Sequence, residues 1–265
     1  MKNNLKSWVG WLLPALLCAV WILATETGGK ESYALPSPRQ LFLVVYDFLT
    51  GSLELTPYSG QLPEHLGRSA FRVLKGFLLA GSLGITMGFL TGRVPFFRRV
   101  TDPLVQAVRA IPGIGFLPIS IVWFGVGEKN TLFLITLAAF FPIYLNTQEG
   151  AAAIPEDFLR SGRMLGAKKA ALFLHVILPA SVPQVFVGLR LGLGVAWAYL
   201  VLGEMTGVSK GIGAVMMNGR MLGNVELVMT GMIVIAVAGK LTDYLLLKVY
   251  ELAYPGPKRT VMRKG

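Results

Sequence analysis

Charged side chains that could do chemistry are concentrated in one polar segment, 149–183, between two long apolar stretches. Its spacing predicts a helix over 156–169, with lysines at the end. Glu156 and Asp157 open this helix, which suits the positive end of the helix macrodipole. The segment carries no nucleophile elbow and no metal-ligand cluster, so it favours binding over catalysis. We therefore predict a docking surface for a soluble partner.

The rest of the sequence also lacks the motifs of an enzyme. It has no G-x-x-x-x-G-K-[ST] phosphate loop, so we do not expect this chain to hydrolyse ATP. His65 and His175 are far apart, and Cys18 is the only cysteine, which leaves no group of metal ligands. We predict a chain without a catalytic, metal or cofactor site of its own.

Two residues in an apolar stretch could lie on a transport pathway. Glu204 follows a run of aliphatic residues, and a carboxylate at membrane depth is costly and a candidate functional group. Its alternative is a structural role, paired with Arg190 or a backbone donor. Trp197 is a candidate lining residue, and its alternative is packing or lipid contact.

A broken segment is the third candidate for the pathway. Pro112, Gly113, Gly115 and Pro118 crowd into a short stretch that cannot sustain a regular helix. Irregular backbone at membrane depth is tolerated where it is buried in protein or lines a cavity. We place Pro112, Gly113 and Gly115 on the translocation path; a simple loop before a shorter span is the alternative.

The elements that must position these residues are transmembrane helices. Of the 265 residues, 54% are hydrophobic and 15% charged, whereas soluble domains have about 25% charged residues. We predict an all-α polytopic membrane protein, because a span needs about 20 apolar residues. Six segments qualify: 8–25, 71–91, 111–127, 131–148, 184–206 and 228–248. Gly188, Gly192 and Ala196 recur every four positions and predict a close helix–helix contact.

The spans divide the chain into three parts. Residues 1–70 hold the first span and an external connection with a short amphipathic helix, Arg39–Thr50. Residues 71–250 form a core of five spans with the loop 149–183, and 251–265 form a basic tail. Lys and Arg, Arg109 among them, are more frequent on the side that holds both termini, which predicts cytoplasmic termini.

The positive charge is better explained by a membrane than by nucleic acid. The net charge of +11 suits the orientation of spans and contact with anionic lipid. Arg68, Arg72 and Lys75 share one helix face at the outer end of the second span. They either snorkel to lipid headgroups or form an electropositive rim that attracts an anion.

A spacing inside the polar segment resembles a known signature. Gly166 is followed, after nine residues, by Val176-Ile177-Leu178-Pro179. The cytoplasmic loop of binding-protein-dependent ABC importer permeases reads E-A-A, three residues, G, nine residues, I-x-L-P. Arg160-Ser161-Gly162 stand at E-A-A, so an arginine replaces the acid while the two small residues are kept.

Other stretches resemble the nitrate/sulfonate/taurine/bicarbonate branch of these permeases, so that the likeness covers about residues 65–250. They are Phe71–Phe77, Asp102–Arg109, Trp123–Glu128, Phe140–Thr147 and Gly188–Arg190. The resemblance implies the fold of a type I ABC importer permease with a cytoplasmic coupling helix. It implies that ATPase contacts come from Asp157, Phe158, Arg160, Ser161, Gly162, Arg163, Met164, Leu165, Gly166 and Ala167.

The resemblance also implies partners and a place in the cell. These are ATPase subunits that bind ATP, a periplasmic or lipid-anchored binding protein and a second permease copy, in the bacterial cytoplasmic membrane. The expected solute is small, an anion such as nitrate, sulfonate, taurine or bicarbonate. Related permeases also carry neutral or cationic pyrimidine- and flavin-type precursors, which are the alternative class of solute. The alternative is a secondary transporter driven by an ion gradient, which needs coupling carboxylates in the spans. Only Glu204 and Asp243 lie near such positions.

Overall fold

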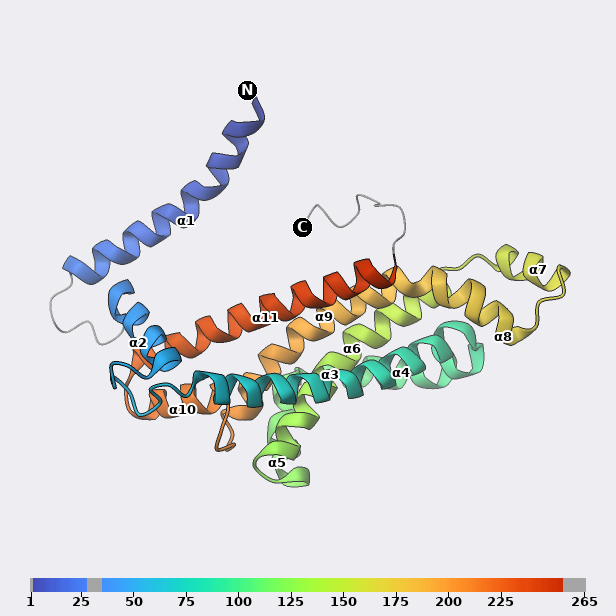
Figure 1. Ribbon diagram of the computed structural model, residues 1–265. Helices are drawn as coiled ribbons and strands as arrows, with labels where there is room; N and C mark the ends of the chain where they lie inside the picture. Colours follow the sequence, from blue (N-terminus) through green and yellow to red (C-terminus); the bar gives the residue numbers. More distant parts are fainter. Residues whose placement is uncertain (1, 28–34, 255–265) are drawn as a thin grey trace.

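The computed structural model describes residues 2–27 and 35–254, and every regular element in those ranges is helical (Figure 1). The α-helices, in chain order, are α1 (Lys2–Thr27), α2 (Pro38–Thr50), α3 (Leu62–Arg93), α4 (Pro95–Ala110), α5 (Phe116–Phe124), α6 (Glu128–Ala152), α7 (Glu156–Met164), α8 (Lys169–Leu172), α9 (Leu178–Glu204), α10 (Ile212–Met221) and α11 (Val225–Ala253). A 3₁₀ turn, Gly113–Gly115, precedes α5, and a π-helical turn, Phe173–Ile177, joins α8 to α9.

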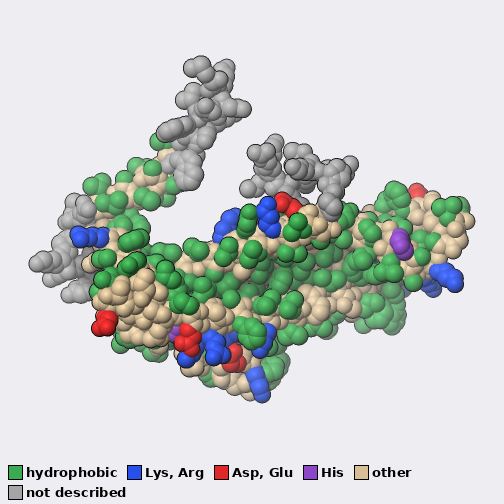
Figure 2. All heavy atoms as spheres, in the orientation of Figure 1, with side chains coloured by type: hydrophobic (Ala, Val, Ile, Leu, Met, Phe, Trp, Pro, Cys, Tyr) green, Lys and Arg blue, Asp and Glu red, His purple; other side chains and the backbone are tan. Residues whose placement is uncertain are grey.

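Four stretches of helix are long and apolar enough to cross a membrane. They are α3, α6, the continuous helix Lys169–Glu204 and α11. A fifth span is possible if α4 and Gly113–Phe124 are taken together, although they meet at 84°. The first predicted span lies in α1, whose described apolar part is Leu12–Thr25. The flank of the molecule that faces the viewer in Figure 2 is largely hydrophobic, as expected beside lipid or another apolar surface.

Glycines let α3 and α9 approach the central helix α6 from two sides. A Cβ added at Gly88 of α3 would lie 2.6 Å from Cβ of Thr147. One added at Gly188 of α9 would lie 2.9 Å from Cβ of Asn146. Ile143 of α6 is fully buried between these helices. Such small residues allow van der Waals packing of helix backbones, which drives association where the hydrophobic effect is absent.

The predicted third span, 111–127, is not a straight helix. α4 ends at Ala110, and the chain turns through the 3₁₀ turn into the short helix α5. Pro112 has no backbone N–H to continue the helical hydrogen bonds. The polypeptide therefore bends beside α6 and α9 instead of crossing the bundle in one piece (Figure 1).

The polar segment also differs from its predicted helix over 156–169. α7 ends at Met164, and Gly166 follows with φ of +81°, a left-handed conformation that ends the helix. The prediction that Lys169 lies at the end of this helix is wrong, because Lys169 begins α8. Since α8 continues through the π-helical turn into α9, the fifth predicted span starts well before residue 184 and is 36 residues long.

The two ends of the bundle carry different connections. At one end, α7 lies near the connection from α3 to α4, and Arg93 Nη1 donates a hydrogen bond to the carbonyl of Ala151 at 3.1 Å. At the other end lie α2 and α10 (Figure 1). α2 begins with a capping box of Ser37 and Gln40, and its residue Phe48 is buried against α10 and α11.

Candidate functional site

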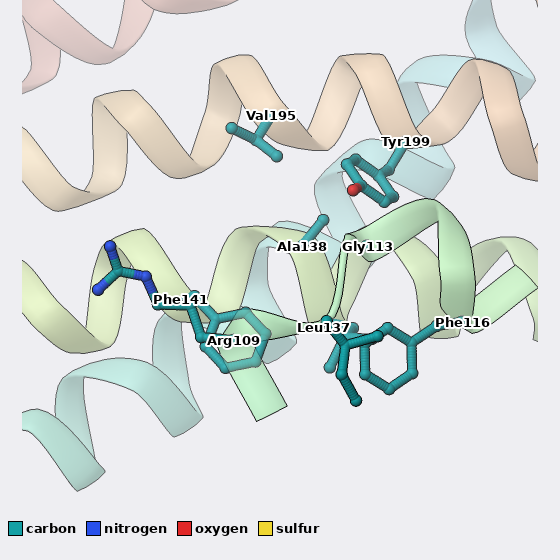
Figure 3. A pocket seen from close by; sticks show the side chains of 9 residues that line it. Arg109, Gly113, Phe116, Leu137, Ala138, Phe141, Val195 and Tyr199 are labelled. Carbon is teal, nitrogen blue, oxygen red and sulfur yellow. The ribbon is translucent and has the colours of Figure 1, made fainter. Parts of the chain in front are cut away.

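The bend between α4 and α5 lines a hollow of about 110 Å³ on the side of α6 and α9. Gly113 lies against Tyr199 of α9, and a Cβ at Gly113 would come within 1.8 Å of the Tyr199 hydroxyl oxygen. Only glycine fits this position without displacing the tyrosine. Figure 3 shows the lining side chains, three of them aromatic. The lining residues are Arg109, Ile111, Gly113, Phe116, Leu137, Ala138, Phe141, Val195 and Tyr199.

Of the three residues of the broken segment that we predicted to line the path, only one lines the hollow. Gly113 lines the hollow. Pro112 precedes it as the cap of the 3₁₀ turn, and Gly115 is exposed at the end of that turn; neither belongs to the lining. The break therefore places only Gly113 at the hollow. Pro112 and Gly115 contribute to the bend of the chain.

Trp197 does not line this hollow. Its side chain is buried in the core with Ala139 and Leu200, and its indole N–H donates to Thr242 Oγ1 of α11 at 3.0 Å. The packing alternative accounts for the geometry, since α9 presents Trp197 to α11 and Tyr199 to the hollow. Residues two apart on a helix point in different directions.

Glu204 is also buried and fully engaged. Its carboxylate accepts hydrogen bonds from Ser69 Oγ at 2.8 Å and from the backbone N–H of Gly213 at 2.8 Å, and it pairs with Arg72. The structural alternative holds, with Arg72 rather than Arg190 as the cation. Arg190 pairs with Asp243 of α11 at 2.7 Å and 2.8 Å. Neither carboxylate is free for an ion-coupling role.

The three cations predicted to share one helix face, Arg68, Arg72 and Lys75, differ in burial in the structure. Arg72 is buried and bridges Glu204 to Glu128, the first residue of α6, whereas Arg68 and Lys75 are exposed. Both readings, snorkelling and an anion-attracting rim, are therefore wrong for Arg72. Its ion pairs join α3 to the first residue of α6 and the last residue of α9.

The polar segment exposes an apolar surface at one end of the bundle. The side chains of Phe158, Met164 and Leu165 are 63%, 87% and 88% exposed. Leu159 points inward and is buried, and Gly162 packs on Leu172, where a Cβ would come within 2.4 Å of a methyl carbon. We call the three exposed side chains the α7 tip. Met164 ends α7 and Leu165 follows it, where this part of the chain protrudes from the bundle (Figure 1).

Charged residues surround the α7 tip. Arg163 pairs with Glu156 at 2.6 Å, and Arg160 lies 4.0 Å from Asp157, all with exposed side chains. Beside the helix lies a groove of about 390 Å³ lined by Phe158 and by residues of α6, α9 and the connections. Arg160, which stands where the permease signature has a glutamate, lies beside Asp157 of its own helix.

The predicted contact of Gly188, Gly192 and Ala196 falls on α6. A Cβ at Gly192 would lie 2.9 Å from a side-chain carbon of Ile143 and 3.1 Å from the carbonyl oxygen of Ala139. Ala196 is fully buried. The small-residue stripe thus serves packing within the chain.

Sequence reasoning missed Tyr199 and Arg109 as lining residues. Tyr199 stands two positions from Trp197, and only the rotation of α9 decides which of them faces the hollow. Arg109 was assigned to a cytoplasmic connection by the count of basic residues, yet it lies at the end of α4, beside the middle of α6. Its position just before the Pro112 break was the one available signal.

Comparison with known proteins agrees with this architecture. Residues 81–251 match the family described as binding-protein-dependent transport system inner membrane component. The chain is 36% identical to the putative aliphatic sulfonates transport permease protein SsuC of Bacillus subtilis, over 88% of this chain and 82% of that protein. It is 30% identical to the taurine transport system permease protein TauC of Escherichia coli, over 86% and 82%.

Two further similarities complete the comparison. The nitrate import permease protein NrtB of Synechocystis is 30% identical over 92% of this chain and 88% of its own length. An inward-facing structure of the MetNI methionine ABC transporter has a chain that matches with a TM-score of 0.54 and 20% identity, over 70% of this chain and 95% of that chain. The latter likeness concerns the fold. By its family match and its close relatives, this chain belongs to the binding-protein-dependent transport system inner membrane components, the permease subunits of ABC importers.

Proposed function

We propose that this permease carries a small anion, such as nitrate, taurine, another sulfonate or bicarbonate, through a pathway beside the α4–α5 bend. The relatives named for sulfonate, taurine and nitrate transport support an anion. The hollow at Gly113 and Tyr199 is lined by residues of α4, α5, α6 and α9 and offers room for a small solute. The secondary transporter has less support, because Glu204 and Asp243 are both bound to arginines.

The energy for transport comes from partner subunits in this proposal. The permease binds no ATP itself; ATPase subunits bind and hydrolyse it, and a binding protein delivers the solute on the opposite side. A second copy of the permease completes the pathway, since α5 exposes large apolar residues such as Val122 and Trp123. Both termini and α7 lie in the cytoplasm, which agrees with the basic residues near them.

The single observation that carries the coupling role is the α7 tip. Apolar side chains as exposed as Met164 and Leu165 fit a groove on another protein. A short helix between two spans moves as a rigid body, so closure of the ATPases would be transmitted to α6 and α9. Arg163, Gly166 and Ala167 hold the shape of the tip; the N–H of Ala167 donates to the carbonyl of Gly162 at 3.0 Å.

A capture experiment tests this docking surface. Leu165→Glu places a charge in the α7 tip, and the residue is so exposed that the fold should not change. We expect the tagged variant to retain much less of the ATPase subunit, co-expressed with it, than wild type. Leu53→Glu, which changes a leucine that is 44% exposed at the other end of the bundle, is the control. Equal retention by both variants would contradict the proposal.

A further inference from the structure

The helix α4 buries few of its side chains, although its end borders the hollow. Within α4, all of which the structure describes, only Val105 is buried. Pro103 lies inside the helix and has no backbone N–H to donate to the carbonyl of Arg99. Arg109, in the last turn of α4, lines the hollow. A contact that fixes α4 therefore also fixes one wall of the hollow.

Asp102 of α4 binds two side chains of α6 with one oxygen atom. Its Oδ1 accepts a hydrogen bond from the Tyr144 hydroxyl at 3.0 Å and another from Gln148 Nε2 at 2.7 Å. Its Oδ2 pairs with Arg98 of its own helix at 3.4 Å, and the arginine side chain is 62% exposed. Tyr144 is fully buried, so the core fixes the position of its ring. The contacts of Asp102 to α6 and to Arg98 therefore depend on different atoms of the carboxylate.

The two partners of Asp102 lie on the face of α6 that also borders the hollow. Leu137 and Phe141 line the hollow (Figure 3). Tyr144 and Gln148 follow them at the three- and four-residue spacing that keeps side chains on one face of a helix. α6 ends at Ala152, and a short connection leads from there to α7. Along α6, the contact with Asp102 thus lies between the hollow and α7.

We propose that Asp102 is a positioning residue for transport, which makes α4 follow α6 when α7 moves. Asp102 does not line the hollow; it acts through the placement of Arg109 there. Without the Oδ1 contacts, α6 would still move with the partner subunits, but α4 would not follow it. ATP would then be hydrolysed without solute uptake. The inference rests on the proposed function and adds a link between α7 and the hollow.

Two substitutions of Asp102 separate the roles of its oxygen atoms. Asp102→Asn keeps Oδ1 as an acceptor for Tyr144 and Gln148 and loses only the pair with Arg98. Asp102→Ala loses all three contacts. Arg98→Gln removes the charge of the exposed partner and leaves the contacts to α6 in place, so it is the matched control.

The experiment measures how many solute molecules are taken up per ATP hydrolysed, in proteoliposomes with permease, ATPase and binding protein. Radiolabelled taurine, nitrate and butanesulfonate are offered, and the solute that wild type transports fastest is used. We expect Asp102→Ala to lower this ratio about tenfold or more, the effect of losing one or two hydrogen bonds. Its ATP hydrolysis should stay within twofold of wild type. Asp102→Asn and Arg98→Gln should keep the wild-type ratio.

A second variant removes the same contact from the side of α6. Tyr144→Phe deletes the hydroxyl that donates to Oδ1 and retains the buried ring. It should lower the ratio several-fold. The double variant Tyr144→Phe/Asp102→Ala should lose no more than Asp102→Ala alone, because both changes break one interaction.

Several results would overturn the role of Asp102. A wild-type ratio in Asp102→Ala or Tyr144→Phe would do so, and so would a loss in Asp102→Asn as large as in Asp102→Ala. An equal fall of uptake and ATP hydrolysis in Asp102→Ala and Tyr144→Phe, or failure of both to assemble with the ATPase, would mark a structural role instead. ATP-dependent uptake of none of the three solutes by wild type would contradict the proposed function as well.

Discussion

At the scale of single residues, buried ion pairs give several charged side chains a structural role. Arg72 links three helices by contacting Glu204 and Glu128, and Ser69 and the N–H of Gly213 complete the hydrogen bonds of Glu204. A buried charge is tolerated only when it is paired and hydrogen-bonded. The network therefore holds α3, α6 and α9 together at one end of the bundle.

Removing Arg72 should destabilise the protein strongly. Arg72→Gln leaves the carboxylate of Glu204 buried without a cation, at a cost of about 3–5 kcal/mol. Thermal unfolding of the purified permease in nanodiscs measures the loss. Arg68→Gln, one helical turn earlier and exposed, is the control and should unfold as wild type does. Similar melting temperatures for both variants would mean that the network contributes little.

Asp47 organises the connection after α2 in a similar way. Its carboxylate accepts the N–H groups of Leu53 and Leu55 at 2.9 Å and 3.0 Å, and Ser59 donates to it at 2.5 Å. Burial raises the pKa of Asp47, but these hydrogen bonds outweigh it and hold the pKa below the ordinary 3.8. The ionised form is thus the one that stabilises this loop.

A pH effect follows from the sign of that shift. Because the folded pKa is lowered, the stabilisation is complete above the ordinary value of 3.8 and is lost as pH falls through the lower folded pKa. Near neutral pH the loop should be insensitive to pH. Asp47→Asn, whose amide nitrogen cannot accept, should instead speed hydrogen exchange of the Leu53 and Leu55 amides at neutral pH. Unchanged exchange in the variant would show that other contacts hold the loop.

At the scale of elements, α9 illustrates two uses of glycine. Gly188 faces α6, and an added Cβ would meet backbone atoms, with Pro142 O at 3.0 Å and Ile143 Cα at 3.2 Å. Gly194, less than two turns later, has no heavy atom within 4 Å of an added Cβ among the described residues. The same residue type is therefore required at one position and replaceable at the other.

The two glycines of α9 make a matched pair of variants. Gly188→Ala should destabilise the permease by about 1–3 kcal/mol, because α6 and α9 must move apart. Gly194→Ala should be neutral or stabilising by up to about 1 kcal/mol, because alanine favours a helix over glycine. Denaturation of the two purified variants under the same conditions compares them. If both behaved alike, close packing on α6 would not be the reason for Gly188.

Sequence patterns predicted the long helices well and their interruptions poorly. Apolar runs of membrane length identified α3, α6 and α11, since burial and lipid contact both demand them. The end of α7 depends on the left-handed backbone of Gly166, and the continuity of α8 with α9 depends on a π-helical turn. Neither the left-handed glycine nor the π-helical turn changes the local hydrophobicity, so a hydropathy profile cannot reveal these features.

The candidate site was partly predictable for the same reason. Two prolines and two glycines marked the break at 112–118, and Gly113 does line the hollow. The face of α9 that borders the hollow depends on how α9 is rotated about its own axis. The close packing of Gly188 and Gly192 on α6 sets this rotation. That rotation buries Trp197 and turns Tyr199 inward, a tertiary result that no local pattern contains.

At the scale of the whole molecule, the α7 tip and the hollow at Gly113 lie apart in the described structure. The α7 tip protrudes at one end, and the hollow at Gly113 lies beside the middle of α6, with α6 and α9 reaching towards both (Figure 1). A shift of α7 on ATP binding would therefore act directly on two helices that line the hollow. This arrangement suits a permease whose movement is driven from outside the chain.

Under the proposed function, solute movement depends on ATP hydrolysed by partners docked at the α7 tip. The most direct measurement is taurine uptake by proteoliposomes that contain permease, ATPase and binding protein, with and without enclosed ATP. We predict uptake that requires ATP, persists when proton and sodium gradients are collapsed, and is lost in Leu165→Glu but not in Leu53→Glu. Uptake without ATP that follows an imposed ion gradient would instead show that this permease is a secondary transporter.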